Sequence, residues 1–377
     1  MDITWTAEVN EQFRIYTGGT AEGFKAIVCA VEPSAEMMRY VMPVRIADSE
    51  QGGADLFARS IRDHTIGLQV KINGIDNLCL SECKFGRSFG AARMVVVTPD
   101  PAEDDAWHFA RKAVHDLQSR LRVPVVSQID YDQKRLHVAL GATLDSIDFA
   151  VRHDPSAIAT TESYISLLAF KGIDIGTASF SVTGIGDLGG RLVRRLVDLG
   201  AAEVVIADRD PKRFTQFATL PTVRPVAMEE VAHAPCHAHI LSADKSFNDS
   251  IGAAWAKNVA TVVVGGPEAG IDRFKESRAL LASHGKEFVP SVLCGSLGLV
   301  SNLEEALGIR PDLGMMCNKF RRLMTVLTDR MEQRDVGLAT ACEELLQGRA
   351  PLDDREQLFV TRSTYAGGNP PLAGELR

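Results

Sequence analysis

Residues 178–210 constrain the fold of this chain more than any other stretch. An apolar run, Phe180–Thr183, leads into Gly184-Ile-Gly-Asp-Leu-Gly189, and an amphipathic segment then covers 188–199. A second apolar run ends at Asp208. Strand, glycine turn, helix, strand and terminal carboxylate follow one another in the order of a dinucleotide-binding βαβ unit. The stretch therefore predicts a parallel sheet and a site for a dinucleotide.

Each residue of this turn has an expected task. Gly184 permits the sharp turn, Gly186 lets the backbone approach a pyrophosphate, and Gly189 lets helix and strand pack closely. Because the helix starts near Leu188, its unpaired N–H groups and positive dipole end face the anion. Asp187 is evidence against a bound pyrophosphate, since a negative side chain beside this group is unfavourable unless it points away. A glycine turn that has lost its ligand is the alternative interpretation.

Asp208, at the end of the second apolar run, indicates which dinucleotide is bound. Asp208 follows Gly184 by 24 residues, a spacing at which a carboxylate binds both ribose hydroxyls of NAD. Arg209 beside it offers a partner for the 2′-phosphate of NADP, but Asp208 and Asp210 oppose that charge. The sequence therefore favours NAD, with NADP as the alternative.

Composition excludes several classes of function. The 377 residues are enough for two domains with full cores, and the net charge of −8 without a basic block argues against nucleic-acid or anionic-membrane partners. No apolar run approaches the roughly 20 residues that span a bilayer, and residues 1–8 do not resemble a secretory signal. The seven cysteines are scattered and odd in number, which predicts free thiols and a cytoplasmic protein.

One crowded segment has the residue types of a metal site. His233, Cys236, His237 and His239 precede the apolar residues Ile240-Leu-Ser. At the entry of a strand, successive side chains point to opposite faces and do not converge on one ion. We therefore predict no metal here.

The second half of the chain alternates between short β-branched runs and helical stretches. This pattern predicts a Rossmann-type, doubly wound parallel sheet with its ligand outside the carboxyl ends of the strands. Its expected strands lie at 179–183, 203–207, 237–242, 259–264 and 287–292. The helices expected after them cover 299–307, 313–334 and 336–347, and the last 28 residues are expected to form an extended tail.

The first 150 residues predict a separate α/β domain with a mixed sheet. Its expected strands cover 13–17, 23–31, 40–46, 67–72, 92–97 and 124–128, and its expected helices lie near 50–63 and 102–121. A hinge is expected near 155–175. The predicted division is a substrate and dimerisation domain over 1–158 and 336–377 and a dinucleotide domain over 159–335, with the C-terminal helices packing back across the cleft.

With these segments in order, the chain resembles the glutamate/leucine/phenylalanine/valine dehydrogenase family, and its leucine-dehydrogenase-like members above all. The resemblance covers most of 20–348. Four segments carry it besides the glycine turn: Gly23-Phe-Lys-Ala-Ile-Val28, Gly67-Leu-Gln-Val-Lys71, Phe89-Gly-Ala-Ala-Arg-Met-Val-Val-Val97 and the run 289–305, which begins Val289-Pro-Ser-Val-Leu-Cys-Gly295.

The resemblance implies oxidation of an α-amino acid to a 2-oxo acid with a nicotinamide cofactor, and an assembly of at least two subunits. It implies that Lys71 holds the substrate carboxylate and that Thr160 or Thr161 meets the nicotinamide amide. For Thr160 and Thr161, an N-cap of a helix at Glu162 is an equally good interpretation. The family's proton-shuttling aspartate falls on Gln128 or, with a shift of two residues, on Asp130.

The chain departs from the family where the amino-acid chemistry is done. The second family lysine, which activates water, falls on Arg93; lysine can be desolvated to a pKa near neutrality, whereas arginine stays charged. The family's asparagine falls on Gly295, which has no side chain to orient a substrate. Extra residues over 72–80 separate Lys71 from the turn before Arg93.

These departures lead to two hypotheses. In the first, the chain is an NAD(P)-dependent oxidoreductase with an altered amino-acid, imino-acid or related carboxylate substrate, held by Lys71 and Arg93 with Asp130 as acid or base. In the second, it is a catalytically lapsed relative that binds a dinucleotide, or nothing, and serves as a regulatory or partner subunit.

Overall fold

The computed structural model divides the chain into two compact units. Unit 1 comprises residues 1–76, 83–154 and 306–308, and unit 2 comprises 77–82, 155–305 and 309–377. The residues whose structure is described are 2–9, 12–48, 61–99, 103–121, 125–131, 134–138, 155–242, 257, 260, 262–265 and 275–362.

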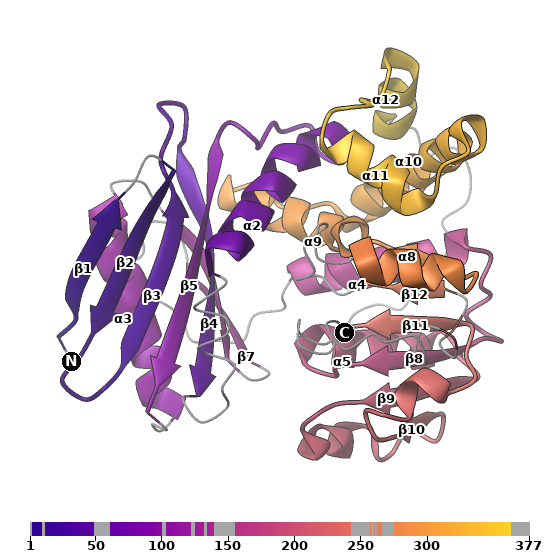
Figure 1. Cartoon of the computed structure of the whole chain (residues 1–377), viewed down its shortest axis with the longest axis horizontal. Helices are drawn as coiled ribbons and strands as arrows, with labels where there is room; N and C mark the ends of the chain where they lie inside the picture. Colours follow the sequence, from indigo (N-terminus) through magenta and orange to yellow (C-terminus); the bar gives the residue numbers. More distant parts are fainter. Residues whose placement is uncertain are drawn as a thin grey trace. The chain divides into compact units, whose positions relative to one another are not determined.

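Unit 1 is built on a seven-stranded mixed sheet in the order β1-β2-β3-β5-β4-β6-β7 (Figure 1). Strand β4 runs parallel to β5 and β6, and the other neighbours are antiparallel. This confirms the predicted mixed sheet. The strands are β1 Thr4–Val9, β2 Phe13–Gly19, β3 Lys25–Val31, β4 Arg39–Asp48, β5 Phe89–Thr98, β6 Val125–Tyr131 and β7 Lys134–Val138.

The alternation of side chains along β5 divides the core of unit 1 between two faces. Ala92, Met94 and Val96 join the large cluster that includes the buried side chains of helix α3, Glu103–Leu121. Val95 lies in a separate cluster with Cys29 and Ile61, the first residue of helix α2. Because successive residues of a strand face opposite sides, odd-numbered residues of β5 share the α2 side.

The strand predicted at 67–72 is wrong, because these residues lie within helix α2, Ile61–Ile75. The buried residues Ile61, Thr65, Leu68, Ile72 and Ile75 recur at three- and four-residue intervals, which is the spacing of one helix face. Leu68 and Ile72, read alone, also fit the ends of a short apolar strand, and only the longer window separates the two periods.

Unit 2 contains a six-stranded, wholly parallel sheet in the order β10-β9-β8-β11-β12-β13 (Figure 1). Numbered along the chain within this sheet, the order is 3-2-1-4-5-6, the arrangement of a Rossmann fold. The predicted doubly wound sheet is thus confirmed. Its strands are β8 Ser179–Thr183, β9 Glu203–Ala207, β10 Val223–Pro225, β11 Ala238–Leu241, β12 Val262–Val264 and β13 Glu287–Val289.

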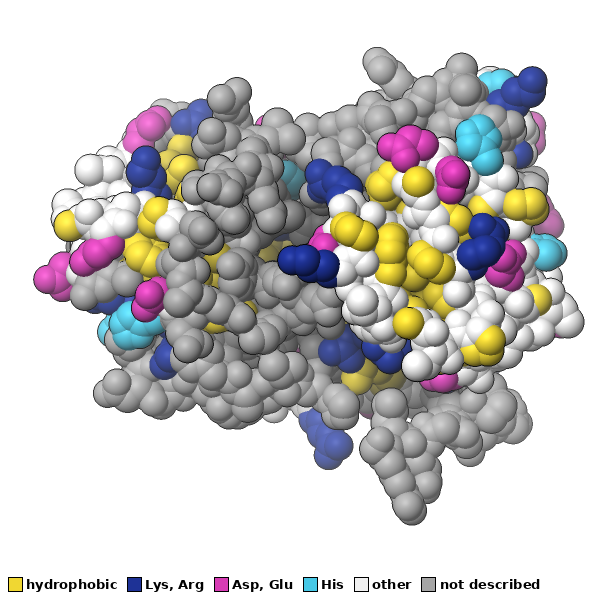
Figure 2. Space-filling view, turned by 90° about the horizontal axis from the view of Figure 1, so that it is seen from below, with side chains coloured by type: hydrophobic (Ala, Val, Ile, Leu, Met, Phe, Trp, Pro, Cys, Tyr) yellow, Lys and Arg dark blue, Asp and Glu magenta, His cyan; other side chains and the backbone are white. Residues whose placement is uncertain are grey.

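Strand β10 was not among the predicted strands. It is three residues long and lies at the edge of the sheet, so its side chains are half-buried or exposed and leave little periodic signal. On the β9–β10 side of unit 2, exposed hydrophobic side chains form a patch with Lys and Arg side chains at its margins (Figure 2).

The helices of unit 2 follow the predicted alternation with the sheet. Helix α10 has the predicted bounds, whereas 155–170, expected to be part of a hinge, forms one continuous helix. Among the described residues of unit 2, the helices outside the short 3-10 turns are α4 Pro155–Phe170, α5 Asp187–Asp198, α8 Lys275–Ser283, α9 Ser291–Ala306, α10 Leu313–Arg334, α11 Leu338–Leu346 and α12 Asp354–Thr361.

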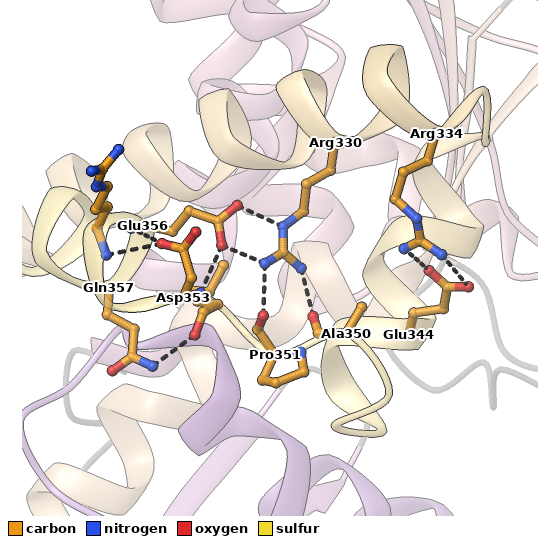
Figure 3. Close-up of polar contacts among 10 residues, drawn as sticks. Arg330, Arg334, Glu344, Ala350, Pro351, Asp353, Glu356 and Gln357 are labelled. Carbon is orange, nitrogen blue, oxygen red and sulfur yellow. Dashed lines mark hydrogen bonds and ion pairs between the residues drawn. The ribbon is translucent and has the colours of Figure 1, made fainter.

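The C-terminal region differs from its prediction in two ways. Helices α11 and α12 belong to unit 2, whereas 336–377 was expected to join the first domain. Part of the expected extended tail, 354–361, is the helix α12, which begins with a capping box between Asp353 and Glu356. Arg330 of α10 holds this segment, donating to Glu356 and to the carbonyls of Ala350 and Pro351 (Figure 3).

Candidate functional site

The predicted glycine turn joins β8 to α5. Gly184 has φ +82°, a left-handed conformation that glycine adopts without steric cost. Its N–H donates to the carbonyl of Ala207 at the end of β9, at 2.8 Å. The turn is therefore sharp and is fixed to the neighbouring strand, as the sequence predicted for the first glycine.

At Gly189 the backbone of helix α5 lies in contact with the backbone of the glycine turn. A Cβ added at this position would lie 1.9 Å from the carbonyl oxygen of Gly184 and 3.0 Å from its carbon. Neither atom belongs to a flexible side chain, so no other residue fits without moving the helix. A Cβ added at Gly190, the next residue, would have its nearest neighbour at 3.5 Å. Gly189, the third glycine of the motif, is therefore the one that packs directly against backbone atoms of the turn.

Helix α5 begins a few residues after the carboxyl end of β8. Gly186 is its N-cap residue and makes no side-chain capping hydrogen bond, and Leu188 packs into the core. A helix start without a capping side chain presents N–H groups and the positive dipole end to an anion. Asp187 is the first residue of α5; its side chain lies outside the description.

The turn lies beside the point where the strand order reverses. From β8 the chain moves to β9 and β10 on one side, and it then returns to β11 on the other. Ser242 follows β11 directly, and its N–H donates to the Thr183 carbonyl at 2.8 Å. Open α/β sheets bind ligands at such a switch point, outside the carboxyl ends of the strands.

Asp208 lies directly after β9, where it was predicted, and its carboxylate holds the turn together. One oxygen accepts from the N–H of Ile185 at 2.8 Å, and the other accepts from the N–H of Asp210 at 2.9 Å. Only 8% of the side chain is exposed. Arg209, the predicted alternative partner for a phosphate, is exposed.

Arg213 belongs to this site, although its spacing gave no signal in the sequence. It lies in the short 3-10 helix η4, Pro211–Phe217, which Asp210 caps by accepting from the N–H of Lys212. Its guanidinium is 3.5 Å from the Asp208 carboxylate and 3.3 Å from where a Cβ of Gly186 would lie. A cation therefore covers the position that the second glycine leaves open, which fits an anionic ligand.

The two threonines predicted near the nicotinamide lie in the middle of α4, so the N-cap interpretation is wrong. Thr160 and Thr161 donate to the carbonyls of Ser156 and Ala157, four residues earlier, each at 2.8 Å. Both side chains are buried, and Thr160 packs where a Cβ of Gly298 would lie. The hydroxyl of Thr161 is thus oriented along its own helix.

A ladder of polar side chains lies inside the sheet directly before the turn. His239 on β11 is fully buried between two hydroxyls of β8: Ser181 contacts its Nδ1 at 2.6 Å and Thr183 its Nε2 at 2.9 Å. Burial lowers the pKa of His239 to about 3, so the imidazole is neutral. Thr183 is the last residue before Gly184, and the ladder therefore ends at the glycine turn.

The histidines and the cysteine of the crowded segment have separate partners. His237 accepts at Nδ1 from the N–H of Ser179, and Cys236 contacts the Ser181 hydroxyl at 3.3 Å. Within the described part of the chain, no three His, Cys, Asp or Glu side chains are grouped as metal ligands. All seven cysteines are free thiols. None of the described helices is long and apolar enough to cross a membrane.

Unit 1 places Lys71 and Arg93 on the same side of its sheet. Lys71 lies on α2 and not on the strand predicted at 67–72. Arg93 lies on β5, among the odd-numbered residues that face α2. Gln69 fixes helix to strand: its side-chain oxygen accepts from the N–H of Ala91 at 2.7 Å, and its amide nitrogen is 3.4 Å from the carbonyl of Phe89. Lys71 and Arg93 are both half-buried.

The backbone register separates the two alternatives for the acid. Gln128 on β6 pairs with Pro43 of β4, and Val44 pairs with Met94, which places Arg93 at the level of Pro43. Asp130 pairs with Arg45, at the level of Val95. Of the two candidates, Gln128 is therefore at the level of Arg93, with β4 between their strands, and Asp130 lies two residues farther along.

Most of the run 289–305, one of the segments that carry the resemblance, lies in helix α9. Cys294 and Gly295 lie in α9, and Cys294 is fully buried, which raises the pKa of its thiol above the ordinary range. The hydroxyl of Ser163 donates to the Cys294 carbonyl. Cys294 is thus a packing residue of unit 2.

Comparison with known proteins identifies solved structures only: no family model and no curated protein matches the chain. The hetero-hexameric glutamate dehydrogenase of Thermus thermophilus, in a leucine-bound form, has a TM-score of 0.61 at 17% identity and covers 86% of this chain and 83% of its own. The L-tryptophan dehydrogenase of Nostoc punctiforme has a TM-score of 0.54 at 15% identity, covering 87% and 93%. Glutamate dehydrogenase of Plasmodium falciparum has a TM-score of 0.56 at 14% identity, covering 86% and 78%.

These neighbours agree with the topology derived above. The alignments cover 86–87% of the chain and therefore extend over both units. The chain has the α/β fold of amino-acid dehydrogenases.

Proposed function

We propose that this protein is a divergent member of the amino-acid dehydrogenase family and a cytoplasmic, nicotinamide-dinucleotide-dependent oxidoreductase with an altered carboxylate substrate. The bound nicotinamide supplies the acceptor or donor of a hydride. The neighbouring structures support the general kind of reaction, since they are glutamate and tryptophan dehydrogenases. By the same analogy we propose an assembly of at least two copies.

The observation that carries the proposal is the geometry of the glycine turn. Gly184 needs its positive φ, Gly189 has no room for a Cβ, and Gly186 faces a guanidinium at the start of α5. These three constraints coincide at the switch point of a parallel sheet. A turn kept only for packing needs the first two constraints but has no use for an open helix start beside a cation.

The proposed substrate is an anion because both residues that the resemblance assigns to it are cations. Lys71 and Arg93 share one side of the unit 1 sheet, and a guanidinium binds a carboxylate with two parallel hydrogen bonds. Arg93 stays charged at neutral pH and does not exchange protons as a lysine does. Asp130 therefore remains the proposed acid or base, because Gln128, the other position to which the family's aspartate corresponds, has no carboxyl group.

A second function is favoured by the same residue. With arginine in place of the water-activating lysine and Gly295 in place of the asparagine, the chain lacks two side chains that the resemblance requires for deamination. The alternative is a relative that binds a dinucleotide without turnover and regulates a partner subunit.

Two measurements test the proposal. Calorimetric titration with oxidised and reduced NAD and NADP is expected to show binding of at least one of them. Absorbance of the reduced nicotinamide is then followed with a panel of amino acids, imino acids and 2-oxo acids. Turnover of any member eliminates the regulatory alternative, and binding without turnover on the whole panel favours it. The absence of heat with all four dinucleotides would overturn the oxidoreductase proposal and would leave only a relative that binds no dinucleotide.

A further inference from the structure

The position of Arg213 bears on which dinucleotide the turn accepts. Its guanidinium lies between the turn and the end of β9, 3.5 Å from Asp208 and 3.8 Å from Asp210. Both distances are longer than those of charge-assisted hydrogen bonds, which lie near 2.8 Å. About a quarter of the Arg213 side chain is exposed, 23%. The guanidinium therefore lies within ion-pair distance of both acids, with part of its surface exposed to solvent.

Asp208 has little capacity left for a ribose. A carboxylate offers about four acceptor sites. The N–H groups of Ile185 and Asp210 occupy two of them, and Arg213 lies against the oxygen that accepts from Ile185. Binding both hydroxyls of an unmodified ribose needs two free sites. In this arrangement Asp208 serves chiefly to fix the glycine turn to β9.

The net charge around Arg213 is positive, which favours binding of an added phosphate. Between 208 and 213 the chain carries the acids Asp208 and Asp210 and the cations Arg209, Lys212 and Arg213, which leaves a net charge of one positive unit. Both acids accept hydrogen bonds from backbone N–H groups, which reduces their repulsion of an anion. A phosphate monoester carries between one and two negative charges at neutral pH and matches a guanidinium in geometry.

From these observations we infer that Arg213 selects NADP(H) over NAD(H) by binding the 2′-phosphate of the adenosine ribose, with Arg209 at the exposed edge of the same site. The inference rests on the proposed dinucleotide function and reverses the preference that Asp208 and Asp210 indicated in the sequence. Arg213 exchanges its long contacts to the two acids for short, bidentate ones to the phosphate. Asp208 keeps its backbone partners throughout.

The test is a set of binding titrations with the full-length protein, using NADPH and NADH fluorescence. Wild type is expected to bind NADPH at least about tenfold more tightly than NADH. Arg213→Ala is expected to weaken NADPH binding by about 10- to 100-fold, since a hydrogen bond to a charged group contributes one to two decades of affinity. NADH binding is expected to change by less than about threefold.

Two further variants control for charge and for folding. Arg224→Ala removes the same charge from exposed β10, where Arg224 pairs with Glu203, and is expected to leave both affinities unchanged. Arg213→Lys keeps the charge without the planar fork, and an intermediate loss is expected for NADPH alone. Displacement of NADPH by adenosine 2′,5′-bisphosphate, but not by adenosine 5′-monophosphate, is expected to follow the same order among the variants.

The outcomes separate this inference from the proposed function. Tighter binding of NADH than of NADPH to wild type, or equal losses for both in Arg213→Ala, overturns the role of Arg213 and leaves the dinucleotide site intact. Failure of wild type to bind either reduced dinucleotide overturns both proposals together.

Discussion

The glycine turn of unit 2 and the α2–β5 region of unit 1 are constrained in opposite ways. In the turn, Gly184 and Gly189 are dictated by backbone conformation and backbone contact, so another residue there changes the fold itself. Along α2 and β5 the packing is satisfied by Leu68, Ile72 and Val95, while Lys71 and Arg93 are half-buried. Nothing in the packing requires a lysine rather than an arginine at residue 93.

The contrast explains why one half of the expected site agrees with the family pattern and the other does not. A dinucleotide site made of backbone groups depends on folding and is retained with the fold. A substrate site made of side-chain tips depends on the substrate alone and is free to change with it. Four substitutions or conditions, taken from the largest expected effect to the smallest, test this distinction.

Gly189→Ala is expected to cause the largest effect. Its Cβ meets the Gly184 carbonyl at 1.9 Å between two backbone segments, and a loss of stability of about 4 kcal/mol is expected, together with loss of dinucleotide binding. Urea denaturation measures the change. Gly190→Ala is the matched control, because its nearest contact is at 3.5 Å and alanine favours a helix by up to about 1 kcal/mol. Equal effects for the two would show that the crossing is looser than the contact implies.

Acidification is expected to destabilise the protein through His239. Its pKa is about 3 in the folded protein and 6.5 in the unfolded chain. Between these values the imidazole is protonated in the unfolded chain but not in the folded protein. The contribution of His239 to the free energy of unfolding is therefore fully present above pH 6.5 and is lost as the pH falls toward 3. The loss by pH 4 is expected to be about 3 kcal/mol. Urea midpoints against pH are expected to fall less steeply for His239→Gln; an identical slope would assign the acid loss to other groups.

Arg330→Ala is expected to cost about 2 kcal/mol, because it removes the ion pair with Glu356 and leaves two backbone carbonyls without their arginine donor. The expected consequence is release of α12, visible as faster hydrogen exchange over 354–361. Arg334→Ala is the control on the same helix (Figure 3): its side chain is 45% exposed and it pairs with Glu344, so a change below about 1 kcal/mol is expected. Similar losses in both variants would contradict the role of the carbonyl contacts.

Arg93→Lys is expected to have the smallest effect. The charge is kept on a half-buried side chain, so the change in stability should stay within about 0.5 kcal/mol. No amino-acid oxidation is expected to appear, because Gly295 still lacks the amide that the family pattern places there. Steady-state assays with the amino-acid panel measure it. Turnover in this variant alone would show that one side chain separates this protein from ordinary deamination.

Backbone-determined features were the ones that could be predicted from the sequence. The parallel sheet of unit 2, the bounds of α10 and the geometry of Gly184 and Gly189 follow from glycine positions and from hydrophobic period. Arg213 could not be found this way. It reaches the turn only because η4 follows directly after Asp210, and no spacing rule places a residue six positions beyond the end of β9.

The errors arose where short patterns fit two structures. Residues 67–72 match a strand when read alone, and only Ile61 and Thr65 before them reveal the helical period. The terminal segment was read as a tail from its prolines and glycines, although Asp353 and Glu356 have the spacing of a capping box. In the first region the deciding residues lie before the ambiguous segment, and in the second they lie at its N-terminal end.

The assignment of residues 77–82 to unit 2 bears on how the protein can be cut for experiments. This segment leaves and re-enters unit 1 in the chain, yet Ser81 donates to Glu304 at 2.6 Å and Asn77 to the Leu346 carbonyl at 3.1 Å. Glu82 pairs with Lys319, whose side chain is only 2% exposed. A fragment starting at residue 155 would therefore carry an enclosed ammonium without its counter-ion, and expression of the second unit alone calls for a six-residue peptide supplied in trans or a rewired chain.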